Sequence, residues 1–201
     1  MSSIKEVLTF WFGSPALDFT PTKVQRQRWF AATPELDLEI QQDFSEITDQ
    51  ALEGELNHWR QTLQGELALI LLCDQFARNI YRGNDQAFAG DPLALDITEG
   101  ILRRGDTRSL GLFQQIFVGM PLEHSEKLPM QRRSVAYFGQ LQREYRGDQS
   151  VAPYLATHYR YALAHEAVIE QFGRYPHRNA ALGRESTKEE LQWLAQGGGF
   201  K

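Results

Sequence analysis

The stretch PYLATHYRYALAHEAVIEQF, residues 153–172, decides the fold class. The side chains of one face recur along it at intervals of three and four residues: Leu155, His158, Ala162, His165, Ile169 and Phe172. This spacing is that of one face of an α-helix, whereas a half-buried strand alternates at every second residue. The sequence therefore predicts a long helix over residues 153–172 with one buried face.

Other segments carry helix-start signals followed by the same spacing. Thr33-Pro34-Glu35 combines a cap, a proline at the first helical position and an acid near the positive helix end, before a stripe of apolar residues that runs to Ala51. Ser3 with Glu6, and Ser186 with Glu189, have the spacing of capping boxes. Asp91-Pro92 predicts a further helix capped by Asp91.

Helical segments account for most of the chain. Besides 153–172, we expect helices at residues 3–12, from 33, at 65–79, from 91, at 108–119, at 129–146 and from 186. No alternating stretch is long enough to predict a strand. About eight helices with short connections indicate an all-α fold of antiparallel helix hairpins. The 201 residues contain no low-complexity linker, so we expect a single helical domain, 1–201, with about residues 196–201 as a flexible tail.

Composition narrows the class of protein. The net charge is −5, and no basic face of the kind that binds nucleic acid is evident. The longest apolar run, Leu67–Cys73, falls short of the roughly 20 residues that span a bilayer. Cys73 is the single cysteine, so a disulfide framework is excluded. We expect a cytoplasmic protein that binds neither nucleic acid nor a membrane.

The first candidates for chemistry are the two histidines on the buried face of segment 153–172. Burying an imidazole costs free energy unless its nitrogens find partners. His158 and His165 are therefore either satisfied core residues or groups that act as a ligand or in proton transfer. A zinc-protease motif beginning at His165 fails, because position 169 is isoleucine.

Three further polar groups interrupt apolar patterns. Asp74 and Arg78 lie four residues apart, so they form a buried ion pair or leave the guanidinium to hold a carboxylate or phosphate. Segment 121–126 brings Glu123, His124 and another acid into a turn that suits proton transfer or is an ordinary polar connection. Segment 172–179 is basic after Gly173, either complementing a helix dipole or binding an anion.

Long motifs in the same order resemble those of the bacterial DUF924 family, a family of unknown function. They are VLTFWFG (7–13), RWF (28–30), GEL (54–56), LALILLCDQFARN (67–79), AFAGD (87–91), MPLEHSE (120–126), FGRYPHRN (172–179) and LGREST (182–187). Ala77, Cys73 and Tyr175 stand where the family usually has proline, leucine and phenylalanine. The resemblance implies a TPR-like α-α superhelix of helix hairpins, and it implies no activity.

The leading hypothesis is that these polar residues converge on one cavity between helices. The candidates for catalysis are Glu123, His124, His165 and His177, and the candidates for ligand binding are Asp74, Arg78, Asn79, Arg174, Arg178 and Asn179. Such a cavity would bind a small anionic molecule, with arginines as anchors and His and Glu for acid/base chemistry. The residues identify no nucleophile, substrate or cofactor, so enzyme and binding protein both remain open.

Two alternatives use the same residues differently. In the first, the protein is a TPR-like module that binds a peptide or partner protein, and its polar motifs are structural. In the second, Glu123, His124, Glu126 and either His165 or His177 form a metal site. The spacing of these ligands is not that of a zinc motif, so no metal is predicted.

Overall fold

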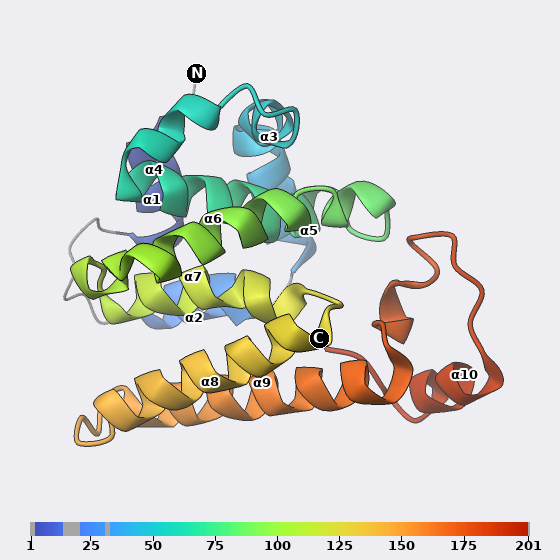
Figure 1. Ribbon diagram of the computed structural model, residues 1–201. Helices are drawn as coiled ribbons and strands as arrows, with labels where there is room; N and C mark the ends of the chain where they lie inside the picture. The colour runs from blue at the N-terminus through green and yellow to red at the C-terminus, as the bar shows by residue number, and fades with distance from the viewer. Residues whose placement is uncertain (1–2, 14–20, 31–32, 201) are drawn as a thin grey trace. The chain divides into compact units, whose positions relative to one another are not determined.

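All the regular secondary structure of the described residues, 3–13, 21–30 and 33–200, is helical in the computed structural model (Figure 1). The predicted all-α fold class is therefore confirmed. The chain divides into two units, Met1–Pro121 and Leu122–Lys201. The TPR-like arrangement and the single-domain organisation stay predictions.

The first unit contains most of the helices. They are α1 (Ile4–Phe12), α2 (Lys23–Phe30), α3 (Pro34–Leu52), α4 (Leu63–Ile70), α5 (Ala77–Ile80), α6 (Asp91–Arg104) and the greater part of α7 (Leu112–His124). The 3-10 turns η1 (Asn57–Gln61), η3 (Asp85–Phe88) and η4 (Asp106–Ser109) connect them, and the π-helical segment η2 (Leu71–Phe76) joins α4 to α5. The second unit holds the end of α7, then α8 (Leu128–Glu144), α9 (Ala152–Phe172), η5 (Pro176–Arg178) and α10 (Lys188–Ala195).

Two predicted helix starts are confirmed by their caps. Glu6 donates its backbone N–H to Ser3 Oγ at 3.3 Å, and Ser3 N–H donates back to Glu6 Oε2 at 2.6 Å. The Leu36 N–H donates to Thr33 Oγ1 at 3.2 Å. Each bond satisfies a backbone group that the first turn of a helix leaves unpaired.

The other two predicted caps were wrong by one residue. Helix α6 is capped by Gly90, because the Asp91 carboxylate turns away to accept a hydrogen bond from Arg78 at 2.7 Å. The second capping box uses Thr187 and Glu190, while Ser186 accepts a hydrogen bond from another side chain. Serine and threonine are both favoured as N-caps, so the sequence could not decide between these adjacent positions.

The predicted turn at 121–126 was also wrong, because α7 continues to His124 with Pro121 inside it. A proline removes one backbone hydrogen bond, and α7 accepts that loss close to its C-terminal end. The sequence also missed α2, since KVQRQRWF is too polar to show an apolar stripe.

Aromatic side chains form the core of the first unit. Phe117 on α7 lies edge-on to Trp11 at 5.5 Å and to Trp29 at 5.3 Å between ring centroids. Trp29 Nε1 donates to the Trp11 carbonyl at 2.9 Å, which satisfies its polar atom. These contacts show that Trp11 and Trp29 serve packing.

An antiparallel hairpin of α8 and α9 is the main feature of the second unit (Figure 1). The predicted face of α9 is buried, with Leu155 and Ala162 wholly inaccessible to solvent. His158, on the same face, stacks on Phe138 of α8 at 5.7 Å and an interplanar angle of 18°. Gly173 ends α9 in the left-handed conformation, with φ of 69°, as its position predicted.

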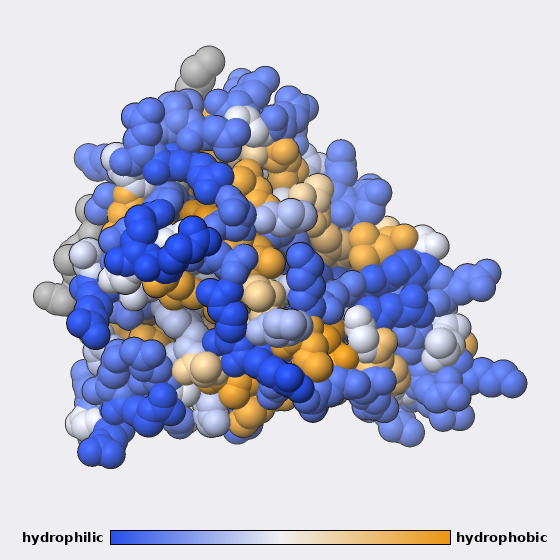
Figure 2. All heavy atoms as spheres, in the orientation of Figure 1, coloured by the Kyte–Doolittle hydropathy of each residue, from blue (hydrophilic) through white to orange (hydrophobic). Residues whose placement is uncertain are grey.

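The surface agrees with this account of the core. Hydrophilic residues predominate on the face drawn in Figure 2, with hydrophobic residues scattered between them. Within the described ranges, no helix has the length and apolar character needed to cross a membrane.

Candidate functional site

The predicted site residues fall into two groups, one in each unit. Asp74, Arg78 and Asn79 lie on η2 and α5 of the first unit. The second unit contains the rest, namely Glu123, His124, His165, Arg174, His177, Arg178 and Asn179. The hypothesis that both groups line one cavity stays a prediction, so each group is considered by itself.

In the first unit, Arg78 is held between two carboxylates. Its Nη2 donates to Asp91 Oδ1 at 2.7 Å and to Asp74 Oδ1 at 3.3 Å. Burial disfavours the charge of Arg78, but the two aspartates outweigh burial and raise its pKa. Of the two interpretations of the sequence, this geometry favours the buried ion pair. The positive charge of Arg78 is already balanced by the two aspartates.

Neighbouring contacts give the same cluster a structural role. Gln75 Nε2 donates to Asp74 Oδ2 at 2.6 Å, and Asn79 Nδ2 donates to the Gln75 carbonyl at 2.9 Å. Burial also raises the pKa of the Cys73 thiol to about 12, so this thiol stays protonated at neutral pH. We conclude that this polar group holds the buried π-helical segment in place.

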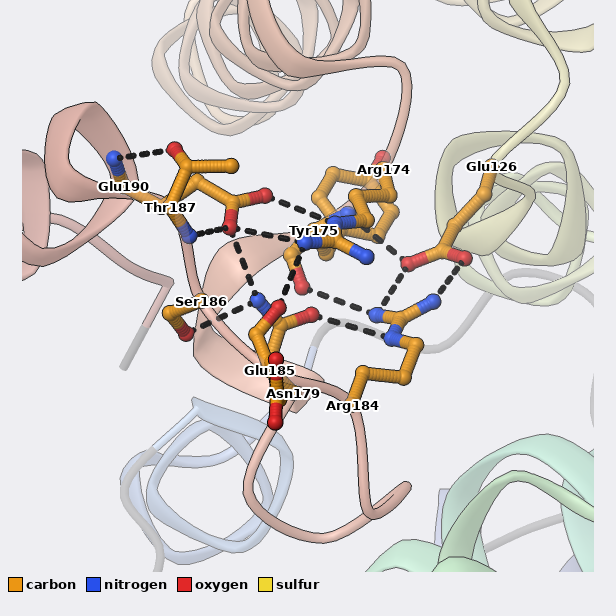
Figure 3. Close-up of polar contacts among 9 residues, drawn as sticks. All are labelled: Glu126, Arg174, Tyr175, Asn179, Arg184, Glu185, Ser186, Thr187 and Glu190. Atoms are coloured by element: carbon orange, nitrogen blue, oxygen red, sulfur yellow. Dashed lines mark hydrogen bonds and ion pairs between the residues drawn. The ribbon is translucent and has the colours of Figure 1, made fainter.

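Two bidentate ion pairs order the segment after α9 in the second unit (Figure 3). Arg174 donates to both oxygens of Glu190, at 2.7 and 2.8 Å. Arg184 donates to both oxygens of Glu126, at 2.7 and 2.9 Å. Asn179 Nδ2 donates to Glu190 Oε2 at 3.2 Å. Arg174 and Asn179, which the sequence offered as ligand-binding residues, are thus bonded within the protein.

Arg184 and Glu190 were missed as partners by the sequence analysis. Arg184 lies in the quoted LGREST stretch, but its partner Glu126 is 58 residues away. Glu190 lies one residue beyond the predicted capping box. Its pKa is lowered to about 2, first by the hydrogen bonds from Arg174, so it is ionised at neutral pH.

Most of the remaining candidates lie near one aromatic side chain, Tyr175. Its ring lies 5.6 Å from that of His165 and 5.4 Å from that of His177, measured between centroids. The Arg178 guanidinium carbon lies 4.6 Å from the Tyr175 ring centroid. His124, at the end of α7, lies 6.4 Å from His165. We call His124, His165, His177, Arg178 and Tyr175 the histidine cluster.

Tyr175 is fixed in the middle of this cluster by its hydroxyl group. The side chain is wholly buried. Its hydroxyl donates to the Glu123 carbonyl at 2.5 Å and accepts from Gln131 Nε2 at 2.7 Å. The segment after α9 is therefore tied through this phenol to Glu123 on α7 and Gln131 on α8, which lie 52 and 44 residues earlier in the chain.

His165 is oriented by two acceptors on one side of its ring. Its Nδ1 lies 2.8 Å from the Tyr161 carbonyl, which can only accept, so Nδ1 carries the proton. Glu123 Oε1 lies 3.3 Å from the same nitrogen. In the neutral ring the lone pair is consequently on Nε2. A carboxylate beside one imidazole nitrogen fixes the tautomer in the same way in catalytic triads and metal sites.

The charge state of His165 follows from its surroundings. Burial lowers its pKa to about 3, and the nearby basic groups His124, Arg178 and His177 act in the same direction. His165 is therefore neutral at pH 7. It can accept a hydrogen bond at Nε2.

The metal-site alternative requires at least three ligands around one point. In the part of the chain that the structure describes, no three His, Cys, Asp or Glu side chains are arranged to hold a metal ion. Glu126 is instead bonded to Arg184 through both of its oxygens. The geometry thus gives no support to a metal centre built on Glu126.

Comparisons with known proteins agree with the resemblance seen in the sequence. The family described as "Bacterial protein of unknown function (DUF924)" matches residues 7–198. A solved structure, that of the protein of unknown function ATU0120 from Agrobacterium tumefaciens, is 29% identical, with a TM-score of 0.78. The match covers 96% of this chain and 97% of that one. No curated protein matches.

Proposed function

The chain belongs to the DUF924 family of bacterial proteins of unknown function, and we propose that its second unit binds a small anionic molecule at the histidine cluster. One observation carries the proposal. The imidazoles of His165 and His177 and the Arg178 guanidinium lie around Tyr175, and a third imidazole, His124 of α7, lies 6.4 Å from His165. Groups of this kind bind carboxylates and phosphates through charge-assisted hydrogen bonds.

The balance of charge supports an anionic ligand. Glu123 is the carboxylate next to His165, at 3.3 Å from its Nδ1. Glu126, whose pKa Arg178 helps to lower, already accepts two hydrogen bonds from Arg184. The Arg178 guanidinium, which lies over the Tyr175 ring, would attract an anion bound beside it.

His165 has a separate role in this proposal. With Nδ1 donating to the Tyr161 carbonyl, its neutral ring presents the Nε2 lone pair to a ligand. That lone pair can accept a hydrogen bond or a proton from a hydroxyl or amino group of the bound molecule. The Glu123 carboxylate beside Nδ1 would stabilise the imidazolium that such a transfer produces.

The proposal is tested by titrating the protein with inorganic phosphate, acetate and benzoate while the ring signals of its five histidines are followed by NMR. We expect at least one anion to shift the signals of His124, His165 and His177. Removing one imidazole of the cluster, as in His177→Asn, should weaken binding about tenfold. His58→Asn is the matched control, since His58 is exposed on η1 of the first unit.

Two outcomes would count against anion binding. In the first, none of the three anions shifts a histidine signal at millimolar concentration. In the second, His177→Asn and His58→Asn bind as well as the wild type. Either result would leave the peptide-binding, TPR-like module as the better interpretation of these residues.

A second substitution separates binding from proton transfer. In His165→Asn, the amide nitrogen can replace Nδ1 as the donor to the Tyr161 carbonyl, while nothing replaces Nε2. This variant should bind acetate as the wild type does, because acetate has no proton to donate at neutral pH. It should bind a hydroxy acid such as glycolate more weakly than the wild type. Equal binding of glycolate would contradict the role of Nε2.

A further inference from the structure

The chain returns to the histidine cluster after α10 and places Phe200 against it. Three glycines make this turn possible. Gly197 and Gly199 have φ of 86° and 125°, values that side chains disfavour. A Cβ on Gly198 would fall within the Trp193 side chain. Each of the three positions thus requires glycine for Phe200 to reach the cluster.

Phe200 is enclosed by other rings. It stacks on His165 with 3.4 Å between centroids and 13° between ring planes. Tyr175 and His177 meet it nearly edge-on, at 6.0 Å and 86° and at 5.8 Å and 82°. Tyr161 lies 6.5 Å away. The Phe200 ring is therefore stacked face to face on His165, and the neighbouring rings of Tyr175 and His177, which lie 5.4 Å from each other, meet its side nearly edge-on. We call this position the ring slot.

Phe200, like Phe172 and Trp193, is partly buried against the small apolar core of Val168, Ile169 and Tyr175. Phe172 packs on Trp193 at 5.6 Å between ring centroids. Phe200 also covers the His165 imidazole, whose Nδ1 is bonded to the Tyr161 carbonyl. By covering that ring it withdraws His165 from water, and burial is the main cause of the low His165 pKa.

We propose that the ring slot is the binding position for a planar aromatic ring of the ligand, and that Phe200 is a built-in occupant which the ligand displaces. This inference rests on the proposed anion site and adds the ligand class: an aromatic carboxylate or an aryl phosphate. The ring of the ligand would stack on His165. Its anionic group would lie toward His177 and Arg178, which border Tyr175.

Displacement has a measurable consequence for affinity. While Phe200 fills the slot, an aromatic ligand binds only the fraction of molecules in which the slot is empty, so its apparent affinity is reduced by that fraction. Removing the ring in Phe200→Ala should therefore strengthen benzoate binding at least about tenfold. Acetate, which has no ring, should bind both proteins within about twofold.

The experiment compares wild type, Phe200→Ala and the control Phe172→Ala by isothermal titration calorimetry. The probes are benzoate, its non-planar analogue cyclohexanecarboxylate, acetate and phenyl phosphate. We expect Phe200→Ala to strengthen binding of benzoate, of phenyl phosphate or of both, and the stronger of the two identifies the anionic group. Cyclohexanecarboxylate should gain much less, because a puckered ring cannot stack. Phe172→Ala should change no affinity.

The outcomes separate this inference from the proposed function. If Phe200→Ala strengthens cyclohexanecarboxylate as much as benzoate, or strengthens neither, the ring slot is refuted while anion binding stands. If no probe and no inorganic phosphate binds either protein, the anion site itself fails, and the inference fails with it. An NMR measurement checks the mechanism, because bound benzoate should keep the ring-current shift of the His165 protons in Phe200→Ala and acetate should not.

Discussion

The two buried histidines of α9 should make the protein lose stability between pH 7 and pH 5. Burial lowers the pKa of His158 from 6.5 to about 4 and that of His165 from 6.5 to about 3. Below pH 6.5 the unfolded chain binds protons at these positions and the native protein does not. Stability is therefore fully present above pH 6.5 and decreases as the pH falls toward the folded-state values.

The size of the effect follows from the shift. At pH 5 the solution is about 1.5 pH units below the ordinary histidine pKa, and each unit corresponds to about 1.4 kcal/mol for each histidine. Each buried histidine thus costs about 2 kcal/mol between pH 7 and pH 5, and the pair costs about 4 kcal/mol. The carboxyl groups with lowered pKa, Glu126 and Glu190, add to the loss mainly at lower pH.

The assay is urea unfolding at pH 7 and pH 5, followed by circular dichroism and by tryptophan fluorescence, whose agreement tests two-state behaviour. In His158→Phe the new ring can stack on Phe138 as the imidazole does. This variant should lose about 2 kcal/mol less than wild type over the same pH interval. His58→Phe, at an exposed position, controls for removing a histidine. A loss in His158→Phe equal to that of wild type would refute the reasoning.

Three further predictions are checked by urea unfolding at pH 7. Tyr175→Phe removes the hydroxyl bonds of a buried residue and should cost about 1 kcal/mol. Gly90→Ala would bring a Cβ to 2.5 Å from the Cys73 carbonyl oxygen and 2.7 Å from its Cα, so it should cost about 3 kcal/mol. Asp91→Ala removes the 2.7 Å hydrogen bond to Arg78 and should cost about 2 kcal/mol. Losses under about 0.5 kcal/mol would contradict all three accounts.

Much of the fold could be predicted because local patterns determine it. The face of α9 repeats every three to four residues, and Thr33 caps α3 through a contact only three residues away. The wrong cap predictions arose where two adjacent residues can each cap the same helix. Either Ser186 or Thr187 could cap α10. Thr187 is the cap, because Ser186 Oγ accepts a hydrogen bond from the Asn179 side chain.

The site was harder to predict because partners decide the role of a charged residue, and partners can be far apart in sequence. Arg174 and Arg178 belong to the same basic segment and looked equivalent. The structure pairs Arg174 with Glu190, 16 residues away, while Arg178 lies over the Tyr175 ring. No spacing rule in the sequence connects Arg174 to Glu190, whereas Arg178 contacts a residue only three positions away.

The contacts of Phe200 could not be predicted from the composition of the segment that precedes it. The sequence Gly197-Gly198-Gly199 predicts a flexible tail, and this expectation stays a prediction. Flexibility and occupancy of the ring slot are compatible, because an occupant that a ligand must displace has to be held weakly. The same three glycines that let Phe200 stack on His165 would also let it leave. A tightly bound tail would instead be expected to use side chains that lock its backbone.

If a ligand displaces Phe200 as proposed, the C-terminal segment would control the chemistry of the site. With Phe200 in place, His165 is buried and its pKa is about 3, which makes Nε2 a weak base. Loss of the covering ring would expose the imidazole, and the pKa should rise toward 6.5 because burial is the largest cause of its depression. A ligand that removed Phe200 without covering His165 as fully would thereby produce a stronger base at the moment of binding. Acid/base chemistry at His165 would then depend on the ligand, and the protein without ligand would keep the histidine neutral and covered.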